Sequence, residues 1–219
     1  MTDCSFFRSV MQSTGSFPLQ TLSTRQRLLE HGVIYLTEHG YHGSGIKGIL
    51  ADVNIPKGSF YHYFDSKDTF CAAVIEHYIQ PFLVRLEVLA QDQLLDAGRK
   101  LPFYFRDLIE GAAERNFSGG CLLGNLIGEL GADEKLASVA ALRLAMRNYA
   151  TALAVLIRQG QQAGFFRCDL EAMVMADLLV NQWQGALLRA RLLRSREPLH
   201  ACTDFMILQY FREKALAND

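Results

Sequence analysis

The sequence predicts an all-α protein, with a three-helix helix-turn-helix domain near the N-terminus and a larger helical C-terminal domain. Apolar residues recur at helical spacing along most of the 219 residues, enough for about nine helices. No stretch shows sustained period-two alternation or an Asn-Gly or Asp-Gly hairpin turn. A tight turn between two short helices, at the sequence VNIPKG, is typical of a helix-turn-helix unit.

Start and stop signals place the first four helices. Small polar residues precede several apolar runs as caps, and Pro56 suits the first turn of a helix because no backbone donor is needed there. Asn54 tolerates the positive φ of a tight turn. The four predicted helices are 23–39, opened by Ser23 or Thr24 and ended by Gly40; 45–53, opened by Ser44; 57–64, opened by Pro56; and 67–90, opened by Asp65 or Ser66.

The rest of the chain is predicted to form five further helices. Glycine and proline supply the breaks between them. The predicted ranges are 100–117, 121–131, 134–163, 169–195 and 199–216, with breaks at Pro102, Gly119-Gly120, Gly131, Gly164 and Pro198. The predicted domains are a loose arm over 1–20, the helix-turn-helix domain over 21–67, and a ligand-binding and dimerisation domain over 68–219.

Composition argues against several classes of protein. The five cysteines lie far apart and form no CxxC pair, so we expect neither a zinc site nor a disulfide framework. This use of cysteine fits a protein of the reducing cytoplasm. No run of about 18 apolar residues suggests a membrane span. No Ser/Cys-His-Asp set, metal-ligand spacing or phosphate-binding glycine loop is visible, so we expect neither an enzyme nor a bound cofactor or metal. The net charge of −1 means that any DNA binding must rely on local positive charge.

The segment PKGSFYHYF, residues 56–64, divides its rings between two faces of the predicted third helix. Phe60 and Phe64 are i, i+4 neighbours and should point into the small core. His62 points roughly opposite, and Tyr61 and Tyr63 flank it. In one interpretation the outer rings form a contact surface for DNA; in the other they only cover the core.

The longer segment GIKGILADVNIPKGSFYHYFDSKDTF, residues 45–70, resembles the DNA-binding signature of TetR-family transcriptional regulators. The helical remainder is similar to that family in length and layout. Within it, GGCLLGNLIGEL and QWQGALLRARL are similar to a subgroup that includes NemR and AcuR. The resemblance implies a cytoplasmic homodimeric repressor that binds double-stranded DNA at a palindromic operator and is released by a small-molecule effector, unsaturated or electrophilic in this subgroup. Dimerisation would use the two C-terminal helices.

The positions that match the motif imply a set of DNA contacts. Gly58 would let the backbone approach a major groove, and Lys67 at the start of the fourth helix would meet a phosphate. Gly45 and Gly48 depart from the family pattern, which leaves open a ligand-binding or thiol redox-sensing module with weak or lost DNA binding. The implied DNA-binding residues are Ser44, Lys47, Lys57, Gly58, Ser59, Tyr61, His62, Tyr63 and Lys67.

Sensing is expected in the C-terminal domain. Cys121 opens a helix after two glycines, where a thiol can have a lowered pKa, and NemR-like relatives use a cysteine in a matching context. Alternatively, Cys121 is a small apolar residue at a tight helix start, and the aromatic residues nearby are core. The candidate effector residues are Cys121, Asn125, Phe105, Tyr149, Trp183 and Arg189. Small residues at Gly185, Ala186 and Ala190 suit close helix approach, either in a dimer or within one subunit.

Overall fold

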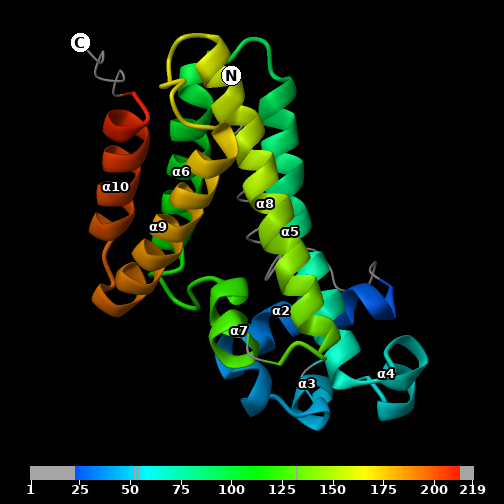
Figure 1. Ribbon diagram of the computed structural model, residues 1–219. Coiled ribbons are helices and arrows are strands. Elements are labelled where there is room, and N and C mark those ends of the chain that lie inside the picture. The colour runs from blue at the N-terminus through cyan, green and yellow to red at the C-terminus, as the bar shows by residue number, and fades with distance from the viewer. Residues whose placement is uncertain (1–22, 52, 54, 132, 213–219) are drawn as a thin grey trace. The chain divides into compact units, whose positions relative to one another are not determined.

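A computed structural model describes residues 23–51, 53, 55–131 and 133–212, which form nine α-helices and one π-helix without any strand (Figure 1). The predicted all-α class is confirmed. The predicted arm at 1–20 and the turn residue Asn54 lie outside the described residues. The elements are α2 (Thr24–Gly43), α3 (Ile46–Ala51), α4 (Lys57–Tyr63), α5 (Lys67–Gln91), α6 (Ala97–Glu114), α7 (Leu122–Leu130), α8 (Ala137–Gln162), α9 (Ala172–Leu193), α10 (Glu197–Thr203) and the π-helix (Asp204–Tyr210).

Packing divides the chain into two compact units, and neither is continuous in sequence. The first unit combines the chain up to Gln80 with residues 119–146, so α7 and the start of α8 belong with the helix-turn-helix. The second unit takes residues 81–118 and the chain from Arg147 onward. The packing boundary therefore falls inside α5 and α8, and the predicted boundary after residue 67 stays a prediction.

The start of α2 confirms the capping role predicted for Ser23. Its Oγ accepts a hydrogen bond from the Gln26 backbone at 3.3 Å, and the Gln26 side chain accepts one from the Ser23 backbone at 3.1 Å. This reciprocal capping box satisfies two donors that a helix N-terminus otherwise leaves unpaired.

Near its end, α2 is kinked rather than ended at Gly40. Gly40 has φ 68° and ψ −178°, a backbone conformation that essentially only glycine adopts, and one further turn follows it. The backbone N–H of His42 donates to Glu129 Oε2 of α7 at 3.0 Å. A Cβ at Gly40 would collide with the Glu129 carboxylate. The first unit thus holds the kink in α2 from a helix 87 residues further along the chain.

Two further predicted helix boundaries were wrong, both at prolines. α6 begins at Ala97, because Asp96 Oδ1 accepts from the Gly98 backbone at 2.8 Å, and Pro102 lies inside the helix. Burial of the apolar face of α6 outweighs the backbone hydrogen bond that Pro102 cannot make. At the C-terminus, Pro198 lies in the first turn of α10 instead of before it, and the chain then widens into the π-helix.

α8 is a core helix. It is long and apolar enough to cross a membrane by length and composition alone, but half of its most apolar window is buried inside the protein.

Candidate DNA-binding surface and effector region

The inner face of α4 is an aromatic cluster. Phe60 is fully buried and Phe64 nearly so, as the helical spacing predicted. Their ring centroids lie 5.5 Å apart, and Phe70 of α5 lies 5.3 Å from Phe60 and 5.0 Å from Phe64. Aromatic pairs at these distances bury a large apolar area and favour a fixed geometry. The cluster fixes the orientation of α4, and therefore which of its residues face outward.

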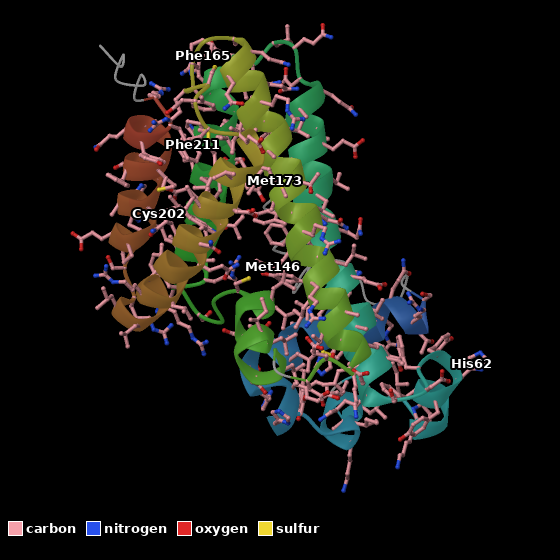
Figure 2. The ribbon with its side chains drawn as sticks, in the orientation of Figure 1. His62, Met146, Phe165, Met173, Cys202 and Phe211 are labelled. Atoms are coloured by element: carbon pink, nitrogen blue, oxygen red, sulfur yellow. The ribbon has the colours of Figure 1, made fainter. Side chains whose placement is uncertain are left out.

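The outer face of α4 is exposed and carries several hydrogen-bonding groups. Tyr61 is 46 % exposed and Tyr63 39 %. His62 points outward from α4 (Figure 2). The ammonium group of Lys57 lies 5.8 Å from the ring centroid of Tyr61. Together with exposed Gly58 and half-buried Ser59, these groups form a face that combines a positive charge, hydroxyls and an imidazole.

Two residues predicted to contact DNA are used inside the domain. Ser44 is buried, and its Oγ donates to the carbonyl of Tyr41 at 2.9 Å, so it closes α2 instead of opening α3. Lys67 Nζ donates to the carbonyls of Tyr41 and Ser44 at 3.0 and 3.1 Å and lies 4.1 Å from the ring centroid of Tyr41. A cation beside the last carbonyls of a helix is favourable. By contrast, Lys47 is exposed on α3.

Glycine at positions 45 and 48 departs from the family pattern. Packing explains the glycine at 48, and nothing in the structure explains the one at 45. A Cβ at Gly48 would collide with the Tyr35 hydroxyl of α2, whose ring stacks on His39 at 4.2 Å. No atom lies within 4 Å of the position that a Cβ at Gly45 would take. Glycine at position 48 therefore leaves room for the Tyr35 hydroxyl against α3.

The carboxylate of Asp68, at the start of α5, caps the N-terminus of α8. It accepts from the backbones of Ala137 and Ser138 at 2.8 and 3.0 Å and from Ser138 Oγ at 2.6 Å. Burial acts to raise the pKa of Asp68, but the hydrogen bonds from Ser138 and Ala137 outweigh it and hold the pKa below its ordinary value. This contact joins α8 to the helix that immediately follows α4.

Replacing Asp68 by alanine is expected to lower the free energy of unfolding by about 1 kcal/mol at neutral pH, because a helix cap is lost. Since folding lowers the Asp68 pKa, its contribution is fully present above the unfolded-state pKa, near 3.8, and is lost as the pH falls through the folded-state pKa. Urea unfolding should show a larger difference from the native chain at pH 7 than at about pH 3. Asp65→Ala removes an exposed carboxylate nearby and is the control; a difference that persists undiminished at low pH would contradict the prediction.

Cys121 and Asn125 lie together at the start of α7 in the first unit. Gly119 and Gly120 both have positive φ, which brings the chain sharply into the helix. Cys121 is half-buried at the N-cap position, and the hydroxyl of Tyr78 donates to its Sγ at 3.9 Å. The Asn125 side chain donates to the carbonyl of Gly119 at 2.9 Å, so it supports the loop that carries the thiol.

The other described cysteines have different surroundings. Burial raises the pKa of Cys71 to about 12 and that of Cys202 to about 11, which keeps both thiols protonated. Cys168 is exposed, and its Sγ donates to the carbonyls of Gln161 and Phe166. Within the described part of the chain, no three His, Cys, Asp or Glu side chains are grouped closely enough to hold a metal ion.

The aromatic candidates for an effector pocket are packed in the core of the second unit. Phe105 and Trp183 meet edge to face with ring centroids 4.8 Å apart, and Tyr104 donates to the Tyr149 hydroxyl at 3.1 Å. All four are at least nine-tenths buried. Arg189, in contrast, is exposed on α9. The structure therefore groups the aromatic candidates with one another, and places Cys121 and Asn125 in the other unit.

A buried ion pair in the second unit was missed from the sequence. Arg85 of α5 donates to Asp107 Oδ2 of α6 at 3.0 Å, and both side chains are less than one-tenth exposed. The ring of Phe103 lies 5.2 Å from the guanidinium of Arg85 and 4.8 Å from that of Arg106. The signal in the sequence was Asp107 itself, a carboxylate placed between the inward positions Phe105 and Leu108 of α6.

Exposed apolar residues are concentrated on the last helices of the second unit. α9 packs against α10, which leads directly into the π-helix. A contiguous exposed apolar patch, unlike single exposed apolar residues, marks a surface that a partner can cover. Those exposed here are Val174, Leu178, Leu188, Leu192 and Leu193 of α9, with Phe205 and Leu208 of the π-helix.

Two family models match the chain. Residues 28–74 match the model described as bacterial regulatory proteins, tetR family, and residues 97–206 match the tetracyclin repressor-like C-terminal domain. The first range spans the helix-turn-helix with its aromatic cluster. The second range contains α6 to α10 and the start of the π-helix.

Curated relatives and solved structures agree with these models. The chain is 34 % identical to the HTH-type transcriptional repressor DhaR of Mycobacterium sp. (strain GP1), over 80 % of this chain and 86 % of that protein. It is 37 % identical to the transcriptional regulator AcuR of Cereibacter sphaeroides, over 81 % of each. The crystal structure of a regulatory protein TetR from Rhodobacter sphaeroides superposes with a TM-score of 0.75 at 36 % identity, covering 83 % of this chain and 95 % of that one. Reduced Escherichia coli NemR superposes with a TM-score of 0.76 at 27 % identity, covering 84 % and 94 %.

Proposed function

Because the chain belongs to the TetR family of bacterial regulatory proteins and is a transcriptional regulator, we propose that it represses transcription by placing the outer face of α4 in the major groove of a palindromic operator. The observation that carries this proposal is the division of α4: Phe60 and Phe64 are buried, so Lys57, Tyr61 and Tyr63 are turned outward. Two relatives named as repressors, DhaR and NemR, support the sign of regulation.

The proposed DNA contacts combine base reading with backbone contacts. Lys57 and Tyr61 have the donors that base edges and phosphates accept, and exposed Gly58 lets the α4 backbone come close to the groove. Lys47 of α3 adds an exposed positive charge. Ser44 would act through the end of α2 instead of contacting DNA, since it is buried. Lys67 keeps one N–H for a phosphate after its two contacts within the domain.

TetR-family regulators act as dimers and bind small-molecule effectors. The exposed leucines of α9 and the apolar residues of the π-helix support a dimer formed by the two C-terminal helices, which would present two α4 helices to two half-sites. Operator DNA lies in the cytoplasm, where we expect the protein to act. Since the relatives reported above are named regulators, regulation and not catalysis is the activity shared with them.

A mobility-shift assay on the DNA beside the protein's own gene tests the proposal. Binding is expected to fall steeply as salt rises, because protein cations displace counterions from the phosphates. Failure to bind any palindrome there at low salt would instead favour a helical sensor that lacks DNA binding.

Replacing Tyr61 by phenylalanine is expected to weaken operator binding about three- to tenfold while leaving folding unchanged, because only an exposed hydroxyl is removed. The mobility-shift titration measures the affinity, and thermal unfolding of the same sample serves as its control. An unchanged affinity would assign Tyr61 to coverage of the core and not to DNA contact.

For the effector, we propose a small electrophilic or unsaturated molecule that reacts with Cys121. The thiol is half-buried at a helix start and accepts a hydrogen bond from Tyr78, whereas the pKa values of Cys71 and Cys202 are raised by burial. The thiolate adds to the β carbon of an electron-poor C=C bond and forms the C–S bond, the π bond breaks, and the α carbanion takes up a proton from water.

Mild treatment with N-ethylmaleimide is expected to add a group at Cys121, besides any adduct at the exposed Cys168, and to release operator DNA. Mass spectrometry locates the adduct and a mobility shift measures release. Cys121→Ser should keep its DNA after treatment, while Cys168→Ser, which removes an exposed thiol, should still release it. Release from treated Cys121→Ser would rule out the covalent mechanism and leave a reversibly bound effector.

A further inference from the structure

A small cavity in the second unit lies between α6 and the segment formed by α10 and the π-helix. Its volume is about 220 Å³, below the roughly 300–1,000 Å³ of sites for drug-sized ligands. The lining combines an apolar set with groups of both charges. The residues are Pro102, Ile109, Ile207 and Leu208 on the apolar side and Arg106, His200, Thr203 and Asp204 on the polar side.

The π-helix contributes Asp204, Ile207 and Leu208 to this lining. Its wider turn is visible in the hydrogen bond from the Phe211 backbone to the Met206 carbonyl, at 2.9 Å and a separation of five residues. Such turns are rare and occur often at functional sites. Here the wider turn accompanies full burial of Phe211 while Asp204 and Ile207 line the cavity.

The two charged side chains of the cavity, Arg106 and Asp204, form no close ion pair with other described residues of the protein. Arg106 is more than half exposed, and its nearest carboxylate, Asp107, is 3.9 Å away and already bonded to Arg85 at 3.0 Å. Stacking on Phe103 at 4.8 Å restrains the Arg106 guanidinium. Asp204 is exposed and forms no ion pair with another residue in the described ranges. The hydroxyl of Thr203 is occupied by the His200 carbonyl at 3.0 Å.

We propose that this cavity binds a small zwitterion, namely an α-amino acid with a short aliphatic side chain. The carboxylate would pair with Arg106, whose guanidinium matches a carboxylate in shape, and the ammonium group with Asp204. The aliphatic chain would lie against Ile109, Ile207 and Leu208. A carboxylic acid or an amine alone would satisfy only one charge and would approach the like charge of the other side chain unbalanced. This proposal goes beyond the proposed control of DNA binding and does not depend on it.

Isothermal titration calorimetry without DNA tests the proposal on the full-length protein in its own oligomeric state, because Leu208 also lies on the apolar surface assigned to the dimer. The probes are L-leucine, 4-methylpentanoate, which lacks the ammonium group, and 3-methylbutylamine, which lacks the carboxylate. L-Leucine is expected to bind at least about tenfold more tightly than either, as the loss of one charge-assisted hydrogen bond implies.

Substitutions locate the site. Arg106→Gln should weaken L-leucine about tenfold and remove its advantage over 3-methylbutylamine, and Asp204→Asn should remove its advantage over 4-methylpentanoate. Arg158→Gln, an exposed arginine of α8 outside the lining, is the matched control and should bind as the native chain does. No heat from L-leucine up to about 10 mM, equal binding of 4-methylpentanoate, or unchanged binding in both cavity variants would each overturn the proposal. None of these outcomes bears on operator binding.

Discussion

Phe60→Ala is expected to lower the free energy of unfolding by about 3–5 kcal/mol, because a fully buried ring is removed and the cavity it leaves cannot close. The rings of Phe64 and Phe70 would each lose a partner at 5.5 and 5.3 Å. These two rings are held by α4 and α5, so the gap has rigid sides. The loss should also loosen the orientation of α4 and weaken operator binding.

Urea unfolding followed by circular dichroism measures the stability effect. The matched variant is Tyr61→Ala, which removes an adjacent ring that is 46 % exposed and should cost about 1 kcal/mol or less. A similar loss in the two variants would show that the division of α4 into an inner and an outer face is wrong. Because the proposed operator contact uses the outer face, Tyr61→Ala should reduce operator binding with little loss of stability.

Asp107→Asn is expected to cost about 3–5 kcal/mol, because it leaves the buried guanidinium of Arg85 without its counter-charge. The amide oxygen can still accept the hydrogen bond that now measures 3.0 Å, which places the cost toward the lower value. The two side chains join α5 to α6, so the substitution should lower the temperature at which the second unit unfolds.

The control for this substitution is Glu134→Gln. Glu134 pairs with Arg143 at 2.8 Å, but both side chains are more than half exposed. Exposed ion pairs contribute about 0–1 kcal/mol, so this variant should unfold close to the native chain. If Asp107→Asn is as stable as Glu134→Gln, water reaches the Arg85 guanidinium in solution and the buried pair does not stabilise the unit.

Helical spacing and capping rules predicted those features of the fold that depend on residues close together in the sequence. The division of α4 follows from helical spacing, and the cap at Ser23 follows from a residue three positions away, so both were visible in the sequence. Lys67 and Ser44 were predicted to contact DNA because they match positions of the family motif. In the structure Lys67 contacts carbonyls 23 and 26 residues earlier, a pairing that no local pattern specifies.

The remaining differences have the same origin in tertiary contacts. Pro102 predicted a break, but α6 gains more from burying its apolar face than it loses at one backbone hydrogen bond. A π-helix has no sequence period that distinguishes it from an α-helix, so the widened turn and the cavity beside it could not be predicted. Packing also showed that the aromatic candidates are core neighbours, while their role in effector binding remains a prediction.

The discontinuous first unit has a consequence for synthesis of the protein on the ribosome. The kink at Gly40 is held by Glu129, and the cap from Asp68 is used at Ala137 and Ser138, so the helix-turn-helix segment emerges before the helices that complete its unit. Until those residues have emerged, the face of α2 that packs against α7 stays uncovered. A nascent chain stalled after Gln80 should therefore be a substrate for proteases and chaperones, and one that has emerged through Met146 should resist them.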